Sequence, residues 1–253
     1  MYMLLWGLMR DPIADIVERI EFRFVKEQDE GRFHPMESVV APAPWQGADV
    51  ANTYIRDTET KVFKNPELLA MTRGTTVAMS YLINALVAVM PKDQVFVNVG
   101  VWHGYTYISA IVDNPTKRCV GVDHFLEFKD NPGKKEFYAL YEKFRTMGSE
   151  FFESDFKDYF RKQHIGPIGV YFYDGEHTYE AHMEGLACAA PFFVPGTYII
   201  IDDIDRPQVY KSILDFLALP ENLNVYEVAL DRKTVHAFHP TWHCGVIVLK
   251  KVR

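Results

Sequence analysis

The sequence has few cysteines and no hydrophobic run long enough to cross a membrane. Its three cysteines, Cys119, Cys188 and Cys244, are odd in number and lie far apart. Their spacing indicates neither a disulfide framework nor a zinc site, so we expect a reducing, cytoplasmic compartment. The apolar start, MYMLLWGLM, has no basic leader and is interrupted at Arg10 and Asp11, too early for a membrane span. We interpret it as a helix that packs on another surface, which predicts a homo-oligomer formed through the N-terminal region.

Basic clusters are missing as well. The chain has 27 Lys and Arg against 34 Asp and Glu, a formal net charge of −7, and its basic residues form no stripe. Because affinity for nucleic acid rests largely on clustered Lys and Arg, we expect no nucleic-acid partner. The hydrophobic share of 48% and the charged share of 24% are those of a globular protein that can bury a full core.

The chain divides near residue 90. We expect residues 1–90 to form an N-terminal helical cap or dimerisation extension, and residues 91–253 to form the main domain. Helical spacing is present over residues 10–30 and again over residues 66–90, and three prolines make residues 35–53 an irregular strap. Covering the carboxyl edge of a sheet and covering a dimer interface explain such an extension about equally well.

Strand and helix patterns alternate through the main domain. Short apolar runs predict seven strands, over residues 95–99, 118–123, 151–153, 168–173, 197–201, 225–230 and 246–250. Helical patterns lie between them, over residues 105–112, 134–147, 156–163, 179–193 and 208–217. This order predicts an α/β, Rossmann-like, doubly wound and mostly parallel sheet of about seven strands, closed by a C-terminal antiparallel hairpin. Ligands of such sheets bind beyond the carboxyl ends of the strands.

The first strand-to-helix crossing carries a glycine turn. Gly100 ends the strand where a ligand needs close approach to the backbone, and Gly104 opens a helix whose free N–H groups attract an anion. The G-x-x-x-G spacing lacks the middle glycine of the dinucleotide fingerprint, which argues against NAD, and alone it fits an ordinary tight turn. Asp123 ends the next strand, where a carboxylate accepts hydrogen bonds from ribose hydroxyls. Asp155 and Phe156 follow the third strand and suit an adenine ring.

Acidic residues follow two later strands. Asp174, Glu176 and His177 lie in one turn, and Asp202 and Asp203 end the strand that comes after it. Carboxylates at one sheet edge repel by about 4 kcal/mol per pair at roughly 4 Å and an effective dielectric near 20. A bound divalent cation would remove that cost. Asp203 is alternatively a helix N-cap, a position that favours Asp.

With these motifs the chain resembles the class I S-adenosylmethionine-dependent methyltransferases. It looks most like the metal-assisted O-methyltransferases, which include macrocin-type sugar enzymes and the cephalosporin-hydroxylase-like group, with catechol-type enzymes as more distant relatives. The resemblance covers residues 95–203, with a closing hairpin that extends to Lys250. Its more specific part is the D-G-x-H-x-Y signature at Asp174, followed by the Pro195-Gly196 pair and by Asp202-Asp203.

The resemblance implies which residues bind S-adenosylmethionine. In the family, the residues matching Gly100, Gly104 and Thr106 hold the methionine part, and the Thr106 hydroxyl receives its carboxylate. Asn98 departs from the pattern, because many members carry Glu or Asp there, near the methionine amine. We expect the cofactor-binding set to be Asn98, Gly100, Gly104, Tyr105, Thr106, Asp123, His124, Asp155 and Phe156.

The resemblance also implies a metal site and a mechanism. Asp174, Asp202 and Asp203 match the metal-binding positions, which take Mg²⁺ or Mn²⁺. Such an ion lowers the pKa of an acceptor hydroxyl and fixes its oxygen in line with the S–CH₃ bond. Asp174 and His177 are the expected catalytic residues, with His177 taking the proton. Holding the turn together and binding the metal directly are the alternatives for this histidine.

We therefore expect an S-adenosylmethionine-dependent O-methyltransferase that acts on a small hydroxylated molecule, such as a sugar or a glycosylated metabolite. An oxidoreductase of the cephalosporin-hydroxylase kind and a cofactor-binding protein without catalysis are the alternatives. Between the last two strands, His236, His239 and His243 with Trp242 form either a surface loop or an acceptor pocket. Their spacing is not that of a recognisable metal site.

Overall fold

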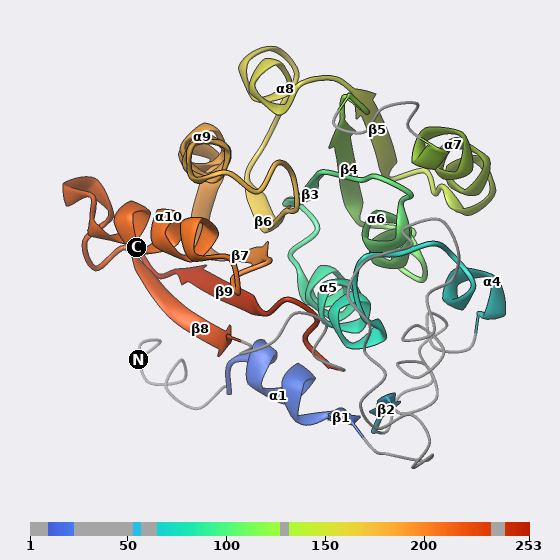
Figure 1. Cartoon of the computed structure of the whole chain (residues 1–253), viewed down its shortest axis with the longest axis horizontal. Helices are drawn as coiled ribbons and strands as arrows, with labels where there is room; N and C mark the ends of the chain where they lie inside the picture. Colours follow the sequence, from blue (N-terminus) through green and yellow to red (C-terminus); the bar gives the residue numbers. More distant parts are fainter. Residues whose placement is uncertain (1–9, 23–52, 57–64, 127–131, 234–240) are drawn as a thin grey trace, which may run out of the picture.

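A computed structural model describes residues 10–22, 53–56, 65–126, 132–233 and 241–253. Within them, one sheet contains β3 (Val95–Val99), β4 (Arg118–Asp123), β5 (Ser149–Glu153), β6 (Ile168–Tyr173), β7 (Phe193–Asp202), β8 (Tyr226–Arg232) and β9 (Val246–Lys251). Its spatial order is β5-β4-β3-β6-β7-β9-β8, and β9 runs antiparallel to both of its neighbours while the other pairs are parallel. The predicted fold class is therefore confirmed (Figure 1).

The strand order reverses between β3 and β6. The chain moves outward from β3 through β4 to β5 and then returns to the other side of β3 as β6. Both central strands are buried along their whole length, as their nearly continuous apolar runs require. Beyond this reversal, the N–H of Asp174 donates to the carbonyl of Val99 over 2.9 Å. A ligand of this sheet is expected at the carboxyl ends of these two strands.

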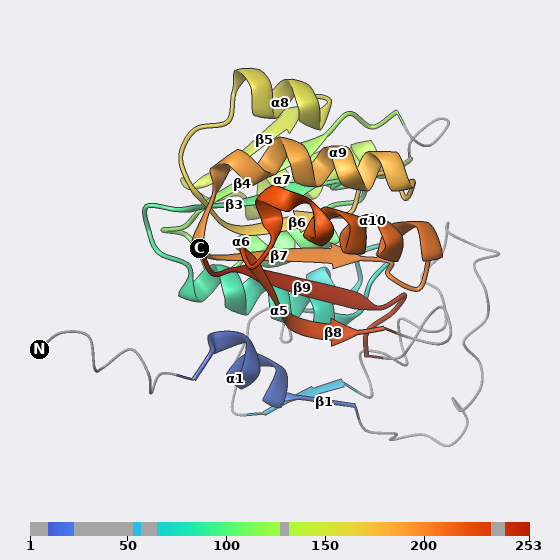
Figure 2. The ribbon, with the colours of Figure 1, turned by 90° about the vertical axis from the view of Figure 1, so that its left-hand side faces the viewer.

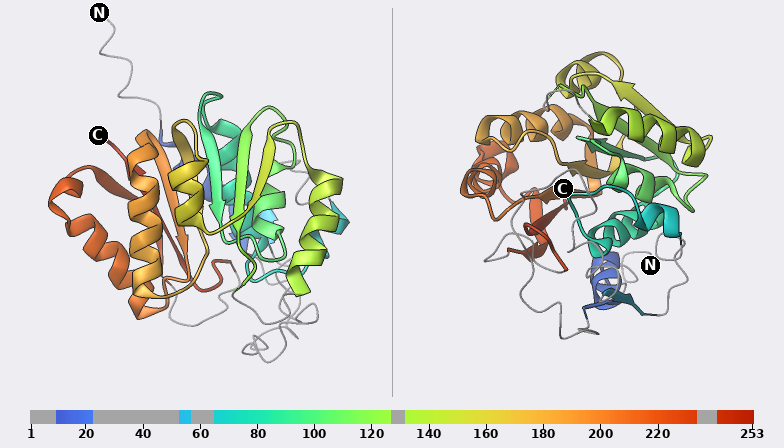
Figure 3. Two further views of the ribbon diagram at one scale, coloured as in Figure 1. Left: turned by 90° about the horizontal axis from the view of Figure 1, so that it is seen from above. Right: turned by 45° about the vertical axis from the view of Figure 1, so that its right-hand side comes forward.

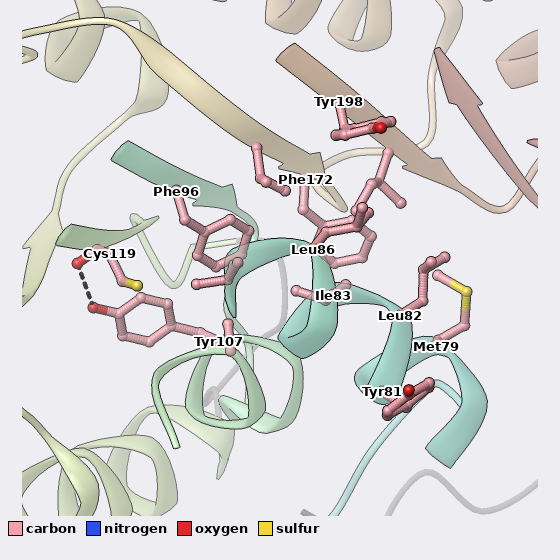
Figure 4. Packing of buried hydrophobic residues seen from close by; sticks show 14 of the residues in the cluster. Met79, Tyr81, Leu82, Ile83, Leu86, Phe96, Tyr107, Cys119, Phe172 and Tyr198 are labelled. Atoms are coloured by element: carbon pink, nitrogen blue, oxygen red, sulfur yellow. Dashed lines mark hydrogen bonds between the residues drawn. The ribbon is translucent and has the colours of Figure 1, made fainter. Parts of the chain in front are cut away.

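Helices cover both faces of the sheet (Figures 1 and 3). One core cluster joins the sheet to α5 (Val77–Val89), α6 (Tyr105–Ile111) and α7 (Pro132–Phe144). The other cluster joins it to α8 (Phe156–Lys162), α9 (Tyr179–Ala189) and α10 (Pro207–Ala218). Figure 4 shows the first cluster, in which the Tyr107 hydroxyl donates to the Cys119 carbonyl over 3.0 Å and so satisfies a polar group inside an apolar layer.

The described N-terminal residues before α5 lie on the side of the sheet that α5, α6 and α7 cover (Figure 2). Helix α1 (Pro12–Glu18) packs on α5, and β1 (Ile20–Phe22) pairs antiparallel with β2 (Thr53–Ile55). Asp11 caps α1 and also accepts hydrogen bonds from Tyr198 and Lys250 of the sheet. The segment MYMLLWGLM and nearly all of the strap at residues 35–53 lie outside the described residues. The division at residue 90, the cap and the oligomer therefore stay predictions.

Two N-terminal helix predictions were wrong. Residues 66–90 are not one helix but α4 (Pro66–Leu69) and α5, because the Thr76 side chain accepts the Met79 N–H and starts a new helix there. Residues 10–30 are not helical throughout either. Helix α1 ends at Glu18, and the apolar residues after it form β1, a case in which strand pairing overrides helical spacing.

Several predicted bounds also shift in the main domain. Helix α9 ends before Pro191, which cannot continue it, and a 3₁₀ turn η2 (Ala190–Phe192) follows. Strand β7 then begins at Phe193, so Pro195 and Gly196 lie within it at a register irregularity opposite β6 instead of in a separate turn. Helix α7 covers Pro132–Phe144, two to three residues earlier than predicted, and η3 (Pro220–Asn222) follows α10. No helix among the described residues is long and apolar enough to span a bilayer.

Candidate active site

The glycine turn after β3 lies in direct contact with the turn after β6. Gly100 has φ +80°, and a Cβ atom on it would fall 1.9 Å from the carbonyl oxygen of Asp174. Gly104, the N-cap of α6, has φ +97°, and a Cβ atom on it would meet the Phe137 ring at 2.6 Å. Only glycine satisfies both the backbone angle and the close approach at these positions. The predicted cofactor turn and the first acidic turn therefore form one structural unit.

Asn98 and Thr106 stabilise the glycine turn through hydrogen bonds. Asn98 is fully buried, and its amide N–H donates to the Gly100 carbonyl over 2.9 Å. The Thr106 hydroxyl donates to the Asn98 amide oxygen over 3.1 Å. An amide can donate and accept at once, whereas an ionised carboxylate can only accept, so asparagine suits this position. Tyr105 is turned into the helix layer, where its hydroxyl lies 3.1 Å from that of Ser80.

Asp123 organises the same turn from β4. Its Oδ2 accepts the N–H groups of Val101 and Trp102 at 2.8 Å each, and its Oδ1 accepts the Phe125 N–H at 2.7 Å. A carboxylate offers about four lone-pair sites, so one site is left for a ribose hydroxyl. His124, beside it, is exposed and accepts the Leu126 N–H through Nδ1 over 3.0 Å.

The predicted adenine-side residues lie at the start of α8. Asp155 is the N-cap of this helix, and its Oδ1 accepts the Lys157 N–H over 2.7 Å. The Phe156 ring packs edge-on against Tyr173, with ring centroids 5.8 Å apart. Both residues have structural contacts of their own, and their binding of adenine stays a prediction.

The acidic residues that follow β6 and β7 meet at His177. Its Nε2 lies 2.6 Å from Asp203 Oδ2 and 3.6 Å from Asp174 Oδ1, and one ligand atom from each of the three residues lies within 4.8 Å of the others. All three side chains remain partly open to solvent, at 23% for His177, 12% for Asp203 and 30% for Asp174. The three side chains are thus partly exposed, although the His177 Nε2 atom itself is buried.

The charges of this group depend on one another. Burial would lower the pKa of His177, but hydrogen bonds and charge from Asp174 and Asp203 raise it to about 10. Burial would raise the pKa of Asp203, but the hydrogen bond from His177 holds it below its usual range. With no cation bound, His177 is therefore an imidazolium near neutral pH. It has no lone pair for an acceptor proton in that state, so a role as base requires this ion pair to open first.

Asp202 does not join the group that Asp174, His177 and Asp203 form. It is 4% exposed, and its Oδ1 accepts the N–H of Asp203 over 2.9 Å. Burial, with the charges of Asp203 and Asp174, raises the pKa of Asp202 well above its usual range, which favours its neutral form. The alternative interpretation of Asp203 as a helix N-cap is wrong, because α10 begins at Pro207 and its N-cap is Arg206.

The structure adds contacts that sequence reasoning missed. Asp203, Asp205 and Cys244 form a second group of ligand atoms within 4.8 Å, and the Asp205 N–H donates to the Cys244 carbonyl over 2.9 Å. His243 is 5% exposed, so its interpretation as part of a surface loop is wrong, while His236 and His239 lie outside the described residues. Chain spacing gave no signal for these contacts, since they join loops about 40 residues apart.

His182 on α9 is another buried histidine that the sequence did not single out. It is 1% exposed, its ring packs against Tyr173 at 4.7 Å, and neither ring nitrogen has a hydrogen-bond partner in the described part of the chain. Its spacing from Leu186 and Ala189 places it on the buried face of the helix, which was the available signal.

The donor set suits a divalent cation. Two carboxylates and an imidazole lie close together beside the glycine turn, which allows close backbone approach to a ligand. The residues present are therefore compatible with both the predicted ion and the predicted cofactor.

Comparisons with known proteins found one matching family model and solved structures with a similar fold. Residues 97–204 match the family model described as a methyltransferase domain. The O-methyltransferase NovP aligns over 83% of this chain and 89% of its own, with a TM-score of 0.56 and 15% identity. CalS11, a TDP-rhamnose 3′-O-methyltransferase of calicheamicin biosynthesis, aligns over 81% and 90% with a TM-score of 0.51 and 18% identity. Cofactor-bound Rv0187 from MTB aligns over 68% and 78%, with a TM-score of 0.51 and 12% identity. No curated protein sequence matches the chain.

Proposed function

We propose that the chain is an S-adenosylmethionine-dependent methyltransferase that moves the methyl group onto a hydroxyl oxygen of a small acceptor, with release of S-adenosylhomocysteine and the hydroxyl proton. The match of residues 97–204 to a methyltransferase-domain model supports this proposal. A sugar or glycosylated metabolite is the proposed acceptor class. The similarity in fold to NovP and to CalS11, whose own substrate is TDP-rhamnose, supports oxygen as the methylated atom and a sugar as its carrier.

One observation carries the proposal. The turn that would hold the cofactor and the group that would hold the acceptor's cation share a contact, because Gly100 approaches the Asp174 backbone more closely than any side chain would permit. A methyl donor bound at the first turn would thus lie next to a hydroxyl bound at the second. Such positioning can supply much of the rate of methyl transfer, which needs a nucleophile in line with the S–CH₃ bond.

The residues of the chain have separate tasks in this proposal. Asp123 and Asn98 shape the glycine turn, and Asp123 has one acceptor site left for the ribose. Asp174 and Asp203 would hold a divalent cation, which when bound supplies positive charge that lowers the pKa of the acceptor hydroxyl. Asp202 keeps the loop after β7 in place through the Asp203 N–H and is not required as a ligand.

Labelled methyl transfer tests this function. Incubating the protein with S-adenosylmethionine labelled in the methyl group, a divalent cation and a panel of nucleotide sugars, glycosides and phenols should label one acceptor class and release S-adenosylhomocysteine. EDTA should abolish transfer, and Mn²⁺ or Mg²⁺ should restore it. Asp174→Asn should lower turnover by about 10- to 100-fold or more, whereas Asp158→Asn, on the exposed surface of α8, should not.

Other outcomes would contradict the proposal. An oxidised product that depends on oxygen would favour an oxidoreductase, and binding of S-adenosylhomocysteine without turnover on any acceptor would favour a binding protein. Full transfer in excess EDTA would show that the carboxylates are structural.

A further inference from the structure

We propose that His177 is itself a ligand of the cation, together with Asp174 and Asp203, and that Asp202 is not. The site would then have one nitrogen and two carboxylate donors and would favour ions such as Mn²⁺, Fe²⁺, Co²⁺ or Zn²⁺ over Mg²⁺. This inference rests on the proposed function only in assuming that a cation binds at this edge of the sheet.

The distances suit a shared ion. Two ligand atoms about 2.1 Å from one ion lie about 3.0 Å apart when at right angles and about 4.2 Å apart when opposite. The observed separations from His177 Nε2 are 2.6 Å to Asp203 Oδ2 and 3.6 Å to Asp174 Oδ1. The first must open by roughly 0.4 Å and the second already lies within the range. Small side-chain rotations are enough for this change.

The backbone holds His177 where such a ligand is needed. At one end of its turn, the Asp174 N–H is bonded to the Val99 carbonyl of β3. At the other end, the His177 carbonyl accepts a hydrogen bond from Gln208 of α10 over 3.1 Å. The turn is therefore tied both to the central strand and to the helix that follows Asp203, so the three donors keep their relative positions.

Asp202 has a different place. One of its carboxylate oxygens is engaged by the Asp203 N–H, and the side chain is nearly inaccessible to solvent at 4%. Among the described residues, the groups of three ligand atoms within 4.8 Å both contain Asp203, and neither contains Asp202. Of the two neighbouring aspartates, only Asp203 is placed to bind an ion beside His177.

The nitrogen donor changes which ions bind well. Mg²⁺ is hard, demands octahedral oxygen ligands and loses water reluctantly. Imidazole suits the later divalent ions of the first transition row, and their affinity rises along that row for a nitrogen-containing site. A site of three carboxylates would discriminate less between Mg²⁺ and these ions.

Pulsed electron paramagnetic resonance of bound Mn²⁺ gives a direct test on the full chain. Spin-echo modulation from a directly bound imidazole nitrogen should be present in the wild-type protein and lost in His177→Gln. Calorimetric titration should show that His177→Gln lowers the preference for Mn²⁺ over Mg²⁺ by about tenfold or more. Asp202→Asn should keep both the nitrogen signal and the preference.

Glu176→Gln serves as the matched control, because Glu176 is an exposed acid in the same turn and should leave Mn²⁺ binding unchanged. Bound Mn²⁺ without nitrogen modulation in the wild-type protein would overturn the inference even if every variant failed to fold. That result would leave the proposed function intact if methyl transfer still occurred. Nitrogen modulation in a protein that transfers no methyl group would instead overturn the function and keep the ligand assignment.

Discussion

Asp123 shapes the glycine turn, and we predict that the same carboxylate also binds the ribose of the cofactor. It accepts three backbone N–H bonds, from Val101, Trp102 and Phe125, which leaves about one of its lone-pair sites for another donor. A purely structural acid and a ribose-binding acid would have the same position here, so affinity for the cofactor and stability of the free protein must be measured separately.

Replacing Asp123 by Asn separates these two roles. Asparagine keeps one acceptor oxygen but loses the charge, so the affinity for S-adenosylhomocysteine should fall by about 1.5–3 kcal/mol, or roughly 10- to 150-fold. Calorimetry measures the affinity of the variant for S-adenosylhomocysteine, and thermal unfolding measures the stability of its cofactor-free form. Unchanged affinity together with a lower melting temperature would leave Asp123 as a loop-organising residue only.

At the scale of elements, the contact between the turns after β3 and β6 decides the site. The Gly100 position requires a positive φ, and it also has the Asp174 carbonyl within 1.9 Å of the place where a Cβ would lie. Gly166, between α8 and β6, has a similar φ of +92° but nothing within 4 Å of that place. A substitution at Gly166 therefore introduces backbone strain alone, whereas one at Gly100 introduces both backbone strain and a steric clash.

Alanine at these two glycines should give different results. Gly166→Ala should destabilise the protein by about 1–2 kcal/mol, the cost of a left-handed conformation for a residue with a Cβ. Gly100→Ala should cost several kcal/mol more or shift Asp174, and should weaken both S-adenosylhomocysteine and Mn²⁺ binding. Denaturant unfolding and calorimetry measure these effects. Equal destabilisation and normal binding in both variants would show that the two turns are not coupled.

At the scale of the whole molecule, buried histidines contribute to how stability changes with pH. Burial lowers the pKa of His182 to about 3, with the charge of His177 adding to the effect, and burial lowers the pKa of His243 to about 4. In the unfolded chain both would titrate near their usual pKa of about 6.5. Below that pH the unfolded chain binds protons that the folded protein does not, so stability falls as the pH falls.

His177 changes the stability of the protein with pH in the opposite direction. Its pKa, raised to about 10 by Asp174 and Asp203 against the effect of burial, contributes stability that is fully present below about pH 6.5 and lost as the pH rises through 10. The cation-free protein should therefore lose stability both in acid and in strong base.

We predict that His182→Phe reduces the acid loss. The phenyl ring can keep the packing against Tyr173, and no hydrogen bond from His182 within the described residues is removed. Between pH 6 and 4.5 the free energy of unfolding should fall less steeply than in the wild-type protein, by about 1.4 kcal/mol per pH unit. Chemical denaturation at several pH values measures the slope, and an unchanged slope would exclude His182 as its source.

The sequence was sufficient for the sheet. Strands such as β3, β4 and β6 begin and end at the predicted residues, because continuous apolar runs bounded by turns have few other ways to be buried. It failed where tertiary contacts override local pattern. Helical spacing predicted one helix over residues 66–90, whereas capping by Thr76 divides it, and Ile20–Phe22 form a strand because β2 is available to pair with them.

The sequence by itself also determined that the glycine turn, Asp123 and the acids after β6 and β7 lie at one edge, since parallel strands end together. Only the tertiary structure decided which of those side chains contact one another. It brought His177 to Asp203, turned Asp202 toward a backbone N–H, and placed Asp205 beside Cys244. Chain order fixes which strand end a residue follows, but side-chain direction depends on the backbone angles and packing of loops from distant segments.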